Sequence, residues 1–301
     1  MIETFILIMG LIAIGGVMKR SSIFPDNTGD VLNIFILNIS LPAIILVSIP
    51  QLKISFELLY PAVAHWILYF IHICLVLMAY KIFKFSRSVL GCLLVVSCLG
   101  NTAFLGIPMI SGFFGGEAVP YAVLYDQLGS GLAFLFTMSF ILPRFTGEDK
   151  KSLKQILISL LKFPPFIALV SGFILINYSI DSYIFNLIER ISQTLIPCSM
   201  IAVGFQIKYK LSMQKIKPIL VGLGLKLIIL PLVSLAIYKF FNVNLLSLKV
   251  SVLQSGMPPM VTAGALAMSA NLEKEISAAL VGYGLLLSFI TLPLLKFLIS
   301  L

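Results

Sequence analysis

The residues best suited to chemistry lie in two stretches that interrupt long apolar runs. The first stretch, residues 97–109, contains glycines, an amide, a hydroxyl and a proline: Gly100, Asn101, Thr102, Gly106 and Pro108. The second stretch, residues 255–264, contains Ser255, Gly256, Pro258, Pro259, Thr262 and Gly264. Glycine and proline disfavour an uninterrupted helix. In hydrocarbon every freed backbone N–H and C=O needs a partner or a polar cavity, so an unwound segment at membrane depth indicates a pathway or a binding site.

Paired breaks in the two halves of a membrane chain are typical of the substrate site of a secondary transporter. If both stretches unwind near mid-membrane and cross, half-helix N-termini offer partial positive charge to an anion, and free carbonyls offer oxygen ligands to a cation. We therefore predict a substrate site formed by Gly100, Asn101, Thr102, Ser255, Gly256, Pro258, Pro259 and Thr262. We predict helix-break residues at Gly106, Pro108 and Gly264. The alternative is that these are ordinary kinks of membrane helices.

Three polar residues inside apolar segments are candidates for coupling or gating: Asp126, Gln127 and Lys226. A charge at the bilayer centre costs on the order of 3 kcal/mol, so Asp126 needs a basic partner, a watery cavity or a proton. Lys226 is too near the middle of its segment to reach the interface easily and is a candidate partner. The alternative is a structural ion pair, or a hydrogen-bonded acid without a transport role.

Two histidines also lie within one apolar segment. His65 and His72 are seven residues apart and share roughly one helix face, which would suit a proton relay. Trp66 follows the first histidine and favours interfacial anchoring and helix contact instead. Glu189 and Arg190 lie close to the end of their segment and are predicted to be interfacial.

The composition is that of an integral membrane protein. Hydrophobic residues make up 59% of the 301 positions and charged residues 11%, which is unlike a soluble domain. The net charge of +9 comes from Lys and Arg in short loops, where such residues orient a membrane protein and meet anionic lipid. The lipid bilayer, and not nucleic acid, is therefore the expected partner. The four cysteines have no metal-ligand spacing and are predicted to be buried apolar residues.

Ten transmembrane spans are predicted at about 20 apolar residues per crossing. They cover residues 2–18, 31–50, 58–80, 88–114, 119–143, 163–178, 183–206, 216–240, 247–270 and 276–299. Most Lys and Arg follow the odd-numbered spans, at residues 19–20, 81–87, 144–154, 208–217 and 274. The positive-inside rule places those loops in the cytoplasm and both termini outside. We expect a multi-pass protein of the plasma (inner) membrane, whose first apolar run is a transmembrane helix and not a signal peptide.

The spans divide into two halves of five. Residues 1–146 and 163–301 are predicted to be inverted repeats, because an odd number of spans makes the second half enter the membrane in the opposite orientation. The linker, residues 147–162, combines basic residues with an apolar stretch and is predicted to form a short amphipathic helix on the cytoplasmic face. A mid-span proline follows an amide in both halves, at residues 38–42 and 193–197. The fold class is therefore all-α, with ten transmembrane helices.

Motifs of soluble catalysis are missing from the sequence. There is no nucleotide-binding glycine loop, zincin signature or nucleophile elbow. An intramembrane enzyme would need an acid pair or a nucleophile with its base, and Asp126 has no such neighbour in sequence. We therefore expect a protein that is not an enzyme and that carries no cofactor or metal.

Three motifs together resemble the auxin efflux carrier family, which includes plant PIN-FORMED carriers and bacterial malate and malonate permeases. They are Gly-Asn-Thr-Ala-Phe-Leu-Gly-Ile-Pro at residues 100–108, Asn-Ile-Ser-Leu-Pro-Ala at residues 38–43, and Lys-Leu-Ile-Ile-Leu-Pro at residues 226–231. The similarity covers essentially the whole chain, and the motif at 100–108 is its most specific part. In the ninth span this chain has Met257 before Pro258, where the plant carriers place an asparagine beside the proline.

The resemblance implies a five-plus-five inverted fold like that of bile-acid symporters and sodium/proton antiporters. Spans one, two, six and seven would form a scaffold, and spans three to five and eight to ten a transport domain in which the fourth and ninth helices cross. It also implies a homodimer and an elevator-like movement. Carried over by position, Asn101 would contact the substrate's carboxylate, and the Pro258–Pro259 region would form the opposite strand.

The sequence thus predicts a secondary active transporter of a small organic anion, a mono- or dicarboxylate, with a proton as the candidate coupling ion. A small aliphatic carboxylate is favoured over auxin. A sodium-coupled organic-anion symporter is the alternative within the same class. A channel, or a membrane scaffold without transport, is the alternative from a different class.

Overall fold

The computed structural model describes residues 2–21, 23–52, 55–147, 152–176, 178, 181–206, 215–241 and 245–301. Within these residues every regular element is a helix, in agreement with the predicted all-α class. Residues 148–151 of the linker and residues 207–214 of the loop after the seventh predicted span lie outside the described residues. The chain divides into two compact units, which are described separately.

Unit 1 comprises residues 1–56, 103–123 and 153–207. Its longer helices are α1 (Ile2–Arg20), α2 (Thr28–Phe35), α3 (Leu41–Ser48), α6 (Ile107–Phe114), α10 (Leu153–Leu161), α11 (Pro164–Leu175), α12 (Ser182–Ser192) and α13 (Leu195–Gln206). Its shorter helical segments are η1 (Ile36–Ser40), η2 (Ile49–Gln51), η5 (Thr102–Gly106), η6 (Gly116–Ala118) and α7 (Val119–Leu124). One residue of η5 and one residue of α7 belong to unit 2.

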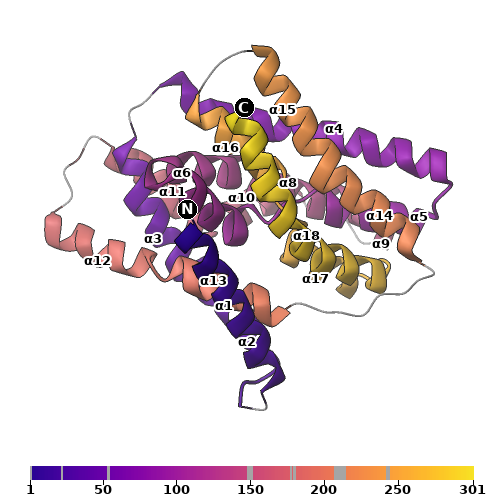
Figure 1. Cartoon of the computed structure of the whole chain (residues 1–301), viewed down its shortest axis with the longest axis horizontal. Coiled ribbons are helices and arrows are strands. Elements are labelled where there is room, and N and C mark those ends of the chain that lie inside the picture. Colours follow the sequence, from indigo (N-terminus) through magenta and orange to yellow (C-terminus); the bar gives the residue numbers. More distant parts are fainter. Residues whose placement is uncertain are drawn as a thin grey trace. The chain divides into compact units, whose positions relative to one another are not determined.

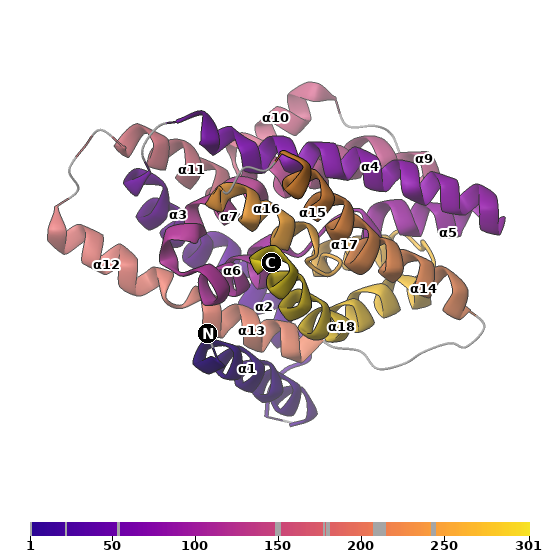
Figure 2. The same cartoon turned by 45° about the horizontal axis from the view of Figure 1, so that its top comes forward.

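Two helices of unit 1, α1 and α13, lie side by side (Figure 1, Figure 2). Glycines make the close approach possible: a Cβ atom on Gly15 would collide with the carbonyl oxygen of Ile201, and one on Gly204 with that of Ile12. Small residues at a helix interface are the usual means of close packing in membranes, where lipid removes the hydrophobic driving force between helices.

Unit 2 comprises residues 57–102, 124–152 and 208–301. Its α-helices are α4 (Tyr60–Phe83), α5 (Arg87–Cys92), α8 (Leu132–Phe136), α9 (Pro143–Thr146), α14 (Ile216–Gly224), α15 (Leu230–Phe241), α16 (Leu246–Ser255), α17 (Val261–Ser269) and α18 (Lys274–Ser300). Four π-helical segments continue some of them: η4 (Leu93–Ser97), η7 (Tyr125–Gly131), η8 (Thr137–Ile141) and η10 (Leu225–Ile229), and the 3₁₀ turn η3 (Phe56–Leu59) precedes α4. Insertions of this kind within α-helices are frequent at functional sites.

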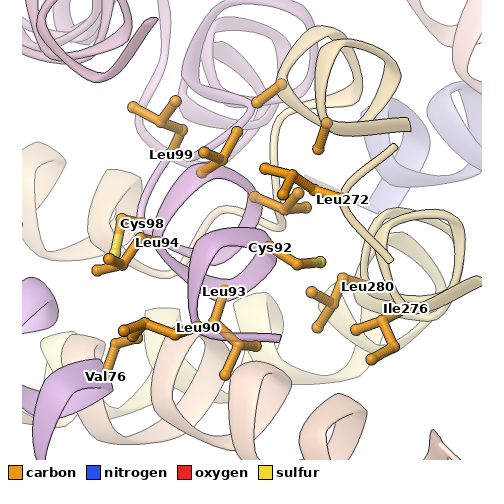
Figure 3. Close-up of a cluster of buried hydrophobic side chains, with 14 of the residues drawn as sticks. Val76, Leu90, Cys92, Leu93, Leu94, Cys98, Leu99, Leu272, Ile276 and Leu280 are labelled. Carbon is orange, nitrogen blue, oxygen red and sulfur yellow. The ribbon is translucent and has the colours of Figure 1, made fainter. Parts of the chain in front are cut away.

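A buried apolar cluster holds unit 2 together. It gathers residues from α4, from α5 with η4, and from α14, α17 and α18. Figure 3 shows Cys92 and Leu93 among these side chains, together with Ile276 and Leu280 of α18. Leu99, which lies in the break between η4 and η5, is part of the same cluster. Dense packing of this kind resists deformation, so the broken segment rests on a rigid base.

The number of helical elements in a predicted span varies, from α18 alone in the tenth to α7, η7, α8, η8 and α9 in the fifth. Five helical stretches are long and apolar enough to cross a membrane: Thr28–Gln51, Phe56–Phe83, Gly116–Thr146, Ile216–Phe240 and Lys274–Ser300. The fourth and ninth predicted spans are interrupted where the sequence predicts breaks, at residues 98–101 and 256–260. The chain is therefore a multi-pass membrane protein, and the ten-span inverted arrangement stays a prediction.

Candidate functional site

The two interrupted segments pair with each other inside unit 2. Gly100 and Pro259 form an isolated antiparallel β-bridge. The N–H of Asn101 donates to the carbonyl of Pro258 at 2.7 Å, and the N–H of Met260 donates to the carbonyl of Leu99 at 2.9 Å. Each break therefore satisfies backbone groups of the other, which is what a non-helical segment in a membrane protein requires.

Local sequence explains why the helices stop at this point. Pro258 and Pro259 have no N–H and cannot continue α16. The serines at the two helix ends bend back: Ser97 Oγ donates to the carbonyl of Leu93 at 2.7 Å, and Ser255 Oγ donates to that of Val252 at 2.6 Å. Because Ser255 uses its proton in this way, its hydroxyl can face a ligand only as an acceptor.

Asn101 places an amide side chain at the bridge between the two interrupted segments. The residue is 3% exposed, and among the described residues its side-chain Nδ2 has no hydrogen-bond partner. A buried amide nitrogen without an acceptor is destabilising by about 1–3 kcal/mol. Buried donors in native proteins almost always have a partner. The side-chain N–H groups of Asn101 are therefore free to donate to a ligand.

Lys226, on η10, adds a positive charge beside the bridge. A Cβ atom built on Gly100 would lie 3.2 Å from Lys226 Nζ, so the ammonium group rests against the backbone of the break. The side chain is 4% exposed and is the one buried Lys or Arg of the described residues. Ion pairs within the described part of the chain are those of Lys215, so Lys226 has no acidic partner there.

The carboxylate of Asp126 is held by neutral donors and is not paired with Lys226. Thr102 Oγ1 donates to Asp126 Oδ1 at 2.5 Å, and Gln127 Nε2 donates to Oδ2 at 2.6 Å. Asp126 and Gln127 belong to η7, whereas Thr102 follows the bridge directly. Asp126 therefore contacts the break through a hydroxyl that the sequence placed at the substrate site.

The other predicted residues take different positions. Gly256 lies in the break after α16, and Thr262 is in the first turn of α17 and partly exposed. Gly264 does not break a helix: it lies inside α17, where a Cβ atom would approach Val281 Cγ2 to 2.5 Å. Its lack of a side chain serves helix packing. Gly106 and Pro108 do not break a helix either: Gly106 ends η5, which continues directly into α6, and Pro108 lies in the first turn of α6, where a proline ring is tolerated.

Gln254 is a site residue that the sequence analysis missed. Its Nε2 donates to the carbonyl of Thr102 at 3.2 Å and so links the ninth predicted span to the fourth. The side chain is fully buried in the last turn of α16. An amide one residue before Ser255, inside an apolar run, was the signal that could have identified it.

Unit 1 contains a cavity of its own, with a volume of about 600 Å³. Helices α3, α6, α12 and α13 contribute to its walls, and the carboxylates of Glu117 and Glu189 line it without any basic side chain. Of the predicted site residues, Pro108 lines it.

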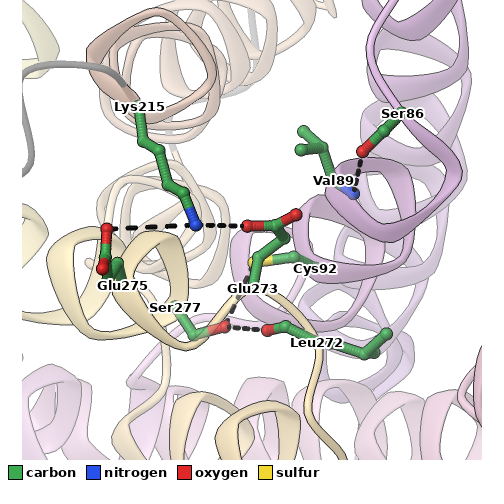
Figure 4. A network of polar contacts seen from close by, with 8 residues as sticks. All are labelled: Ser86, Val89, Cys92, Lys215, Leu272, Glu273, Glu275 and Ser277. Atoms are coloured by element: carbon green, nitrogen blue, oxygen red, sulfur yellow. Dashed lines mark hydrogen bonds and ion pairs between the residues drawn. The ribbon is translucent and has the colours of Figure 1, made fainter.

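A second polar network joins the start of α14 to the start of α18 (Figure 4). Lys215 Nζ lies 2.8 Å from Glu273 Oε2 and 3.9 Å from Glu275 Oε2. The hydrogen bond to Glu273 raises the pKa of Lys215 above its ordinary value. Below this pair, Cys92 Sγ lies 3.1 Å from Ser277 Oγ, which donates to the carbonyl of Leu272.

A polytopic helical protein with a buried, partly unsatisfied polar site at two paired breaks belongs to the class of membrane transporters. Comparison with known proteins identifies the family. The family model for membrane transport proteins matches residues 1–296, so the chain belongs to this family, the auxin efflux carrier family that its motifs resemble.

Two archaeal relatives agree with that assignment. An uncharacterized transporter of Methanocaldococcus jannaschii is 28% identical over 267 residues, which cover 85% of each chain. An uncharacterized transporter of Methanothermobacter thermautotrophicus is 25% identical over 305 residues, which cover 97% of this chain and 96% of the relative. The names of both relatives describe transport and give no substrate.

Proposed function

We propose that this protein is a secondary active transporter that moves a small organic anion, a mono- or dicarboxylate, across the plasma membrane. The observation that carries the proposal is the unsatisfied donor Asn101 Nδ2 at the bridge, together with the ammonium group of Lys226, which lies beside Gly100 and has no ion pair among the described residues. A carboxylate is the ligand that satisfies both, because it accepts hydrogen bonds from an amide and neutralises an ammonium.

The charges around the bridge favour an anion over a cation as the main substrate. Lys226 is buried with no acidic partner among the described residues, and an isolated buried charge is strongly unfavourable unless a counter-charge arrives. The carboxylate of Asp126 already accepts two hydrogen bonds. The bridge therefore attracts negative charge through Lys226, while the Asp126 carboxylate is already held by Thr102 and Gln127.

Asp126 is the proposed coupling residue. Its contact with Thr102 connects its protonation state to the break, because a protonated carboxyl group has fewer acceptor positions for the Thr102 hydroxyl and the Gln127 amide. An anion bound near a charged Asp126 would also meet like-charge repulsion. Protonation of Asp126 removes that repulsion, so a proton and an anion bind more favourably together than either does alone.

The expected architecture accompanies this proposal. Unit 1 holds the helices of predicted spans one, two, six and seven, and unit 2 those of spans three, eight, nine and ten. This division supports a scaffold and a moving domain in an elevator mechanism, although residues 103–123 of spans four and five group with unit 1. A homodimer, extracytoplasmic termini and the five-plus-five inverted repeat complete the proposed arrangement.

A sodium-coupled symporter is the second candidate. The carbonyls of Leu99 and Pro258 each accept one hydrogen bond at the bridge, and a carbonyl oxygen has a second lone pair that can face a sodium ion. A channel and a non-transporting scaffold are the alternatives from a different class: a channel would show neither saturation with substrate nor counterflow in proteoliposomes, and a scaffold would show no flux.

Binding is tested first with the purified protein. Thermal stabilisation is measured with a panel of short mono- and dicarboxylates and with the matched neutral amides, for wild type and Asn101→Leu. We expect stabilisation by carboxylates only, and its loss in the variant. Equal stabilisation by the amides would contradict recognition of an anion.

Transport is tested in proteoliposomes with the stabilising carboxylate. Uptake is measured with an imposed proton gradient, an imposed sodium gradient or neither. Uptake driven by the proton gradient supports coupling through Asp126, and uptake driven by sodium supports the second candidate. Flux that is indifferent to both gradients would contradict either coupling.

A further inference from the structure

A column of buried polar side chains runs between α4 and the segments η7 and η8 of the fifth predicted span, all in unit 2. On α4 it consists of His65, Tyr69 and His72, which lie at positions i, i+4 and i+7 and so share one helix face. From the other side it consists of Ser130 and Thr137. We call these five residues the polar column.

Two side-chain contacts connect the two sides. His65 Nδ1 lies 3.4 Å from Ser130 Oγ, and Tyr69 Oη lies 2.6 Å from Thr137 Oγ1. Thr137 Oγ1 itself donates to the carbonyl of Ala133 at 2.7 Å, so the Tyr69 hydroxyl is the donor in its contact with Thr137. This leaves the oxygen of Tyr69 available as an acceptor between the two histidines.

The column begins next to the coupling residue. Asp126 and Ser130 are four residues apart in η7, one turn of the same element. The ring of Tyr125 meets the His65 ring edge-on, with centroids 4.9 Å apart. Gly129 makes room for His65, because a Cβ atom there would lie 2.5 Å from His65 Cγ. The packing of η7 is thus shaped around this imidazole.

Three ring nitrogens of the column have no partner among the described residues: His65 Nε2, His72 Nδ1 and His72 Nε2. His65 is 5% exposed and His72 is fully buried. A neutral imidazole carries one donor and one acceptor, and a histidine that only fills space would have both satisfied or would be replaced by an apolar residue at lower cost. Ionisable residues inside a membrane span are therefore functional by default.

Charged and titratable groups reach the column from several elements packed against α4. Tyr125 faces it from η7, which also carries Asp126, and η10, which carries Lys226, packs against α4. Cys98 follows η4, which also contacts α4. Tyr238 of α15 lines a small cavity against a different face of α4, together with residues of α16. The elements that carry Asp126 and Lys226 thus both pack against the helix that carries the two histidines.

We propose that the polar column conducts the coupling proton between Asp126 and the level of His72. The proton leaves the Asp126 carboxyl group and adds to one ring nitrogen of His65, which releases its other ring proton onward to His72. Water molecules at the unpaired ring nitrogens would bridge the gaps between side chains. One proton enters and one leaves, so the net charge of the column is unchanged; each imidazole is left in its other tautomer, and a ring flip restores it before the next transfer. By the predicted orientation, the path runs from Asp126 towards the cytoplasmic side.

This inference rests on the proposed proton-linked transport, and the experiment separates the two. In proteoliposomes, net uptake driven by a proton gradient is compared with exchange of labelled for unlabelled substrate. Exchange needs the site and the movement but no net proton transfer. Variants are His72→Leu, His65→Gln and Tyr69→Phe, with Met78→Leu on an exposed face of α4 as the control.

For His72→Leu we expect at least a tenfold loss of gradient-driven uptake, with exchange and carboxylate stabilisation within twofold of wild type. Tyr69→Phe, which removes one hydroxyl, should give a partial loss in the same direction. Gradient-driven uptake at the wild-type rate in both His72→Leu and His65→Gln would overturn the column while leaving proton coupling intact. A wild-type protein that exchanges substrate but ignores the proton gradient would overturn both the coupling and the column.

If His72→Leu also loses exchange and thermal stability, the comparison moves to His72→Gln, which keeps a polar side chain of similar size. A folded His72→Gln protein with normal exchange and lost gradient-driven uptake supports proton conduction. Recovery of gradient-driven uptake in His72→Gln would show that the position needs only polarity and would overturn a relay through its ring.

Discussion

The hydroxyl of Thr102 donates a 2.5 Å hydrogen bond to the carboxylate of Asp126, while the carbonyl of the same residue accepts one from Gln254. Thr102 thus connects the break in the fourth predicted span both to the acid of the fifth and to the helix that leads into the break of the ninth. A substitution at Thr102, Asp126 or Gln254 should therefore alter the hydrogen bonds of the other two residues.

Thr102→Val should expose this connection. The substitution keeps the shape and removes the donor, so a buried carboxylate oxygen loses a hydrogen bond at a cost of about 1–3 kcal/mol. We expect a lower melting temperature of the purified protein and weaker gradient-driven uptake. Thr291→Val is the control, because its buried hydroxyl has no partner among the described residues and its removal should be neutral.

Combining Thr102→Val with Asp126→Asn tests whether the two act together. Asp126→Asn alone should sharply lower flux at unchanged membrane abundance. If the two residues form one unit, the double variant should be no worse than Asp126→Asn, with a coupling energy of about 0.5–3 kcal/mol in the melting data. Strictly additive effects would separate Thr102 from the coupling residue.

Lys226→Met should weaken substrate binding without destabilising the empty protein. A hydrogen bond to a charged group contributes about 1.5–3 kcal/mol, so Kd should rise about 10- to 150-fold. The empty protein should melt at the same or a higher temperature, since methionine removes an unpaired buried charge. Titration calorimetry with the best carboxylate measures the Kd, and a thermal melt of the ligand-free protein measures its stability. Lys81→Met, at an exposed position of α4, serves as the control. An unchanged Kd in Lys226→Met would show that the ammonium group of Lys226 does not contribute to substrate binding.

Gly284→Ala should disturb the bridge between Gly100 and Pro259, because Gly284 of α18 packs against Pro259. A Cβ atom at this position of α18 would lie 2.6 Å from Pro259 Cδ and 3.1 Å from Leu223 Cδ2. The proline ring is rigid, so the bridge strand must move, at an overpacking cost of about 1–3 kcal/mol. We expect at least tenfold weaker carboxylate binding by thermal shift. Gly224 in α14 has open space around it, so the control variant Gly224→Ala should bind carboxylate like wild type. Wild-type binding in Gly284→Ala would show that the bridge can move without weakening carboxylate binding.

The pair of Lys215 and Glu273 should make a small, pH-dependent contribution to stability. Its hydrogen bond raises the pKa of Lys215, so the contribution is complete below the ordinary lysine pKa and is lost as pH rises through the raised value. Lys215 is more than a third exposed, and such pairs contribute less than about 1 kcal/mol. Glu273→Gln should therefore lower the melting temperature slightly at neutral pH and low salt. The difference should vanish in strongly alkaline solution; a constant difference across that range would assign the effect to backbone strain at the positive φ of Glu273.

Much of the fold could be predicted from the sequence. Apolar length sets where a chain can enter a bilayer, and Gly, Pro and polar residues in residues 97–109 and 255–264 are incompatible with a continuous helix. These are local properties, so the breaks at 98–101 and 256–260 were found where expected. Gly264 was misread because glycine serves helix packing as readily as helix breaking, and only its neighbour Val281 distinguishes the two.

Pairing between distant residues was decided by the tertiary structure. The sequence offered Lys226 as a partner for Asp126, but Asp126 is held by Thr102 and Gln127, and Lys226 rests beside Gly100. A sequence states which groups are costly to bury. Which neighbours satisfy them depends on how helices far apart in the chain are packed, and that packing leaves Asn101 Nδ2 without an acceptor and Lys226 beside Gly100 without an acidic partner among the described residues.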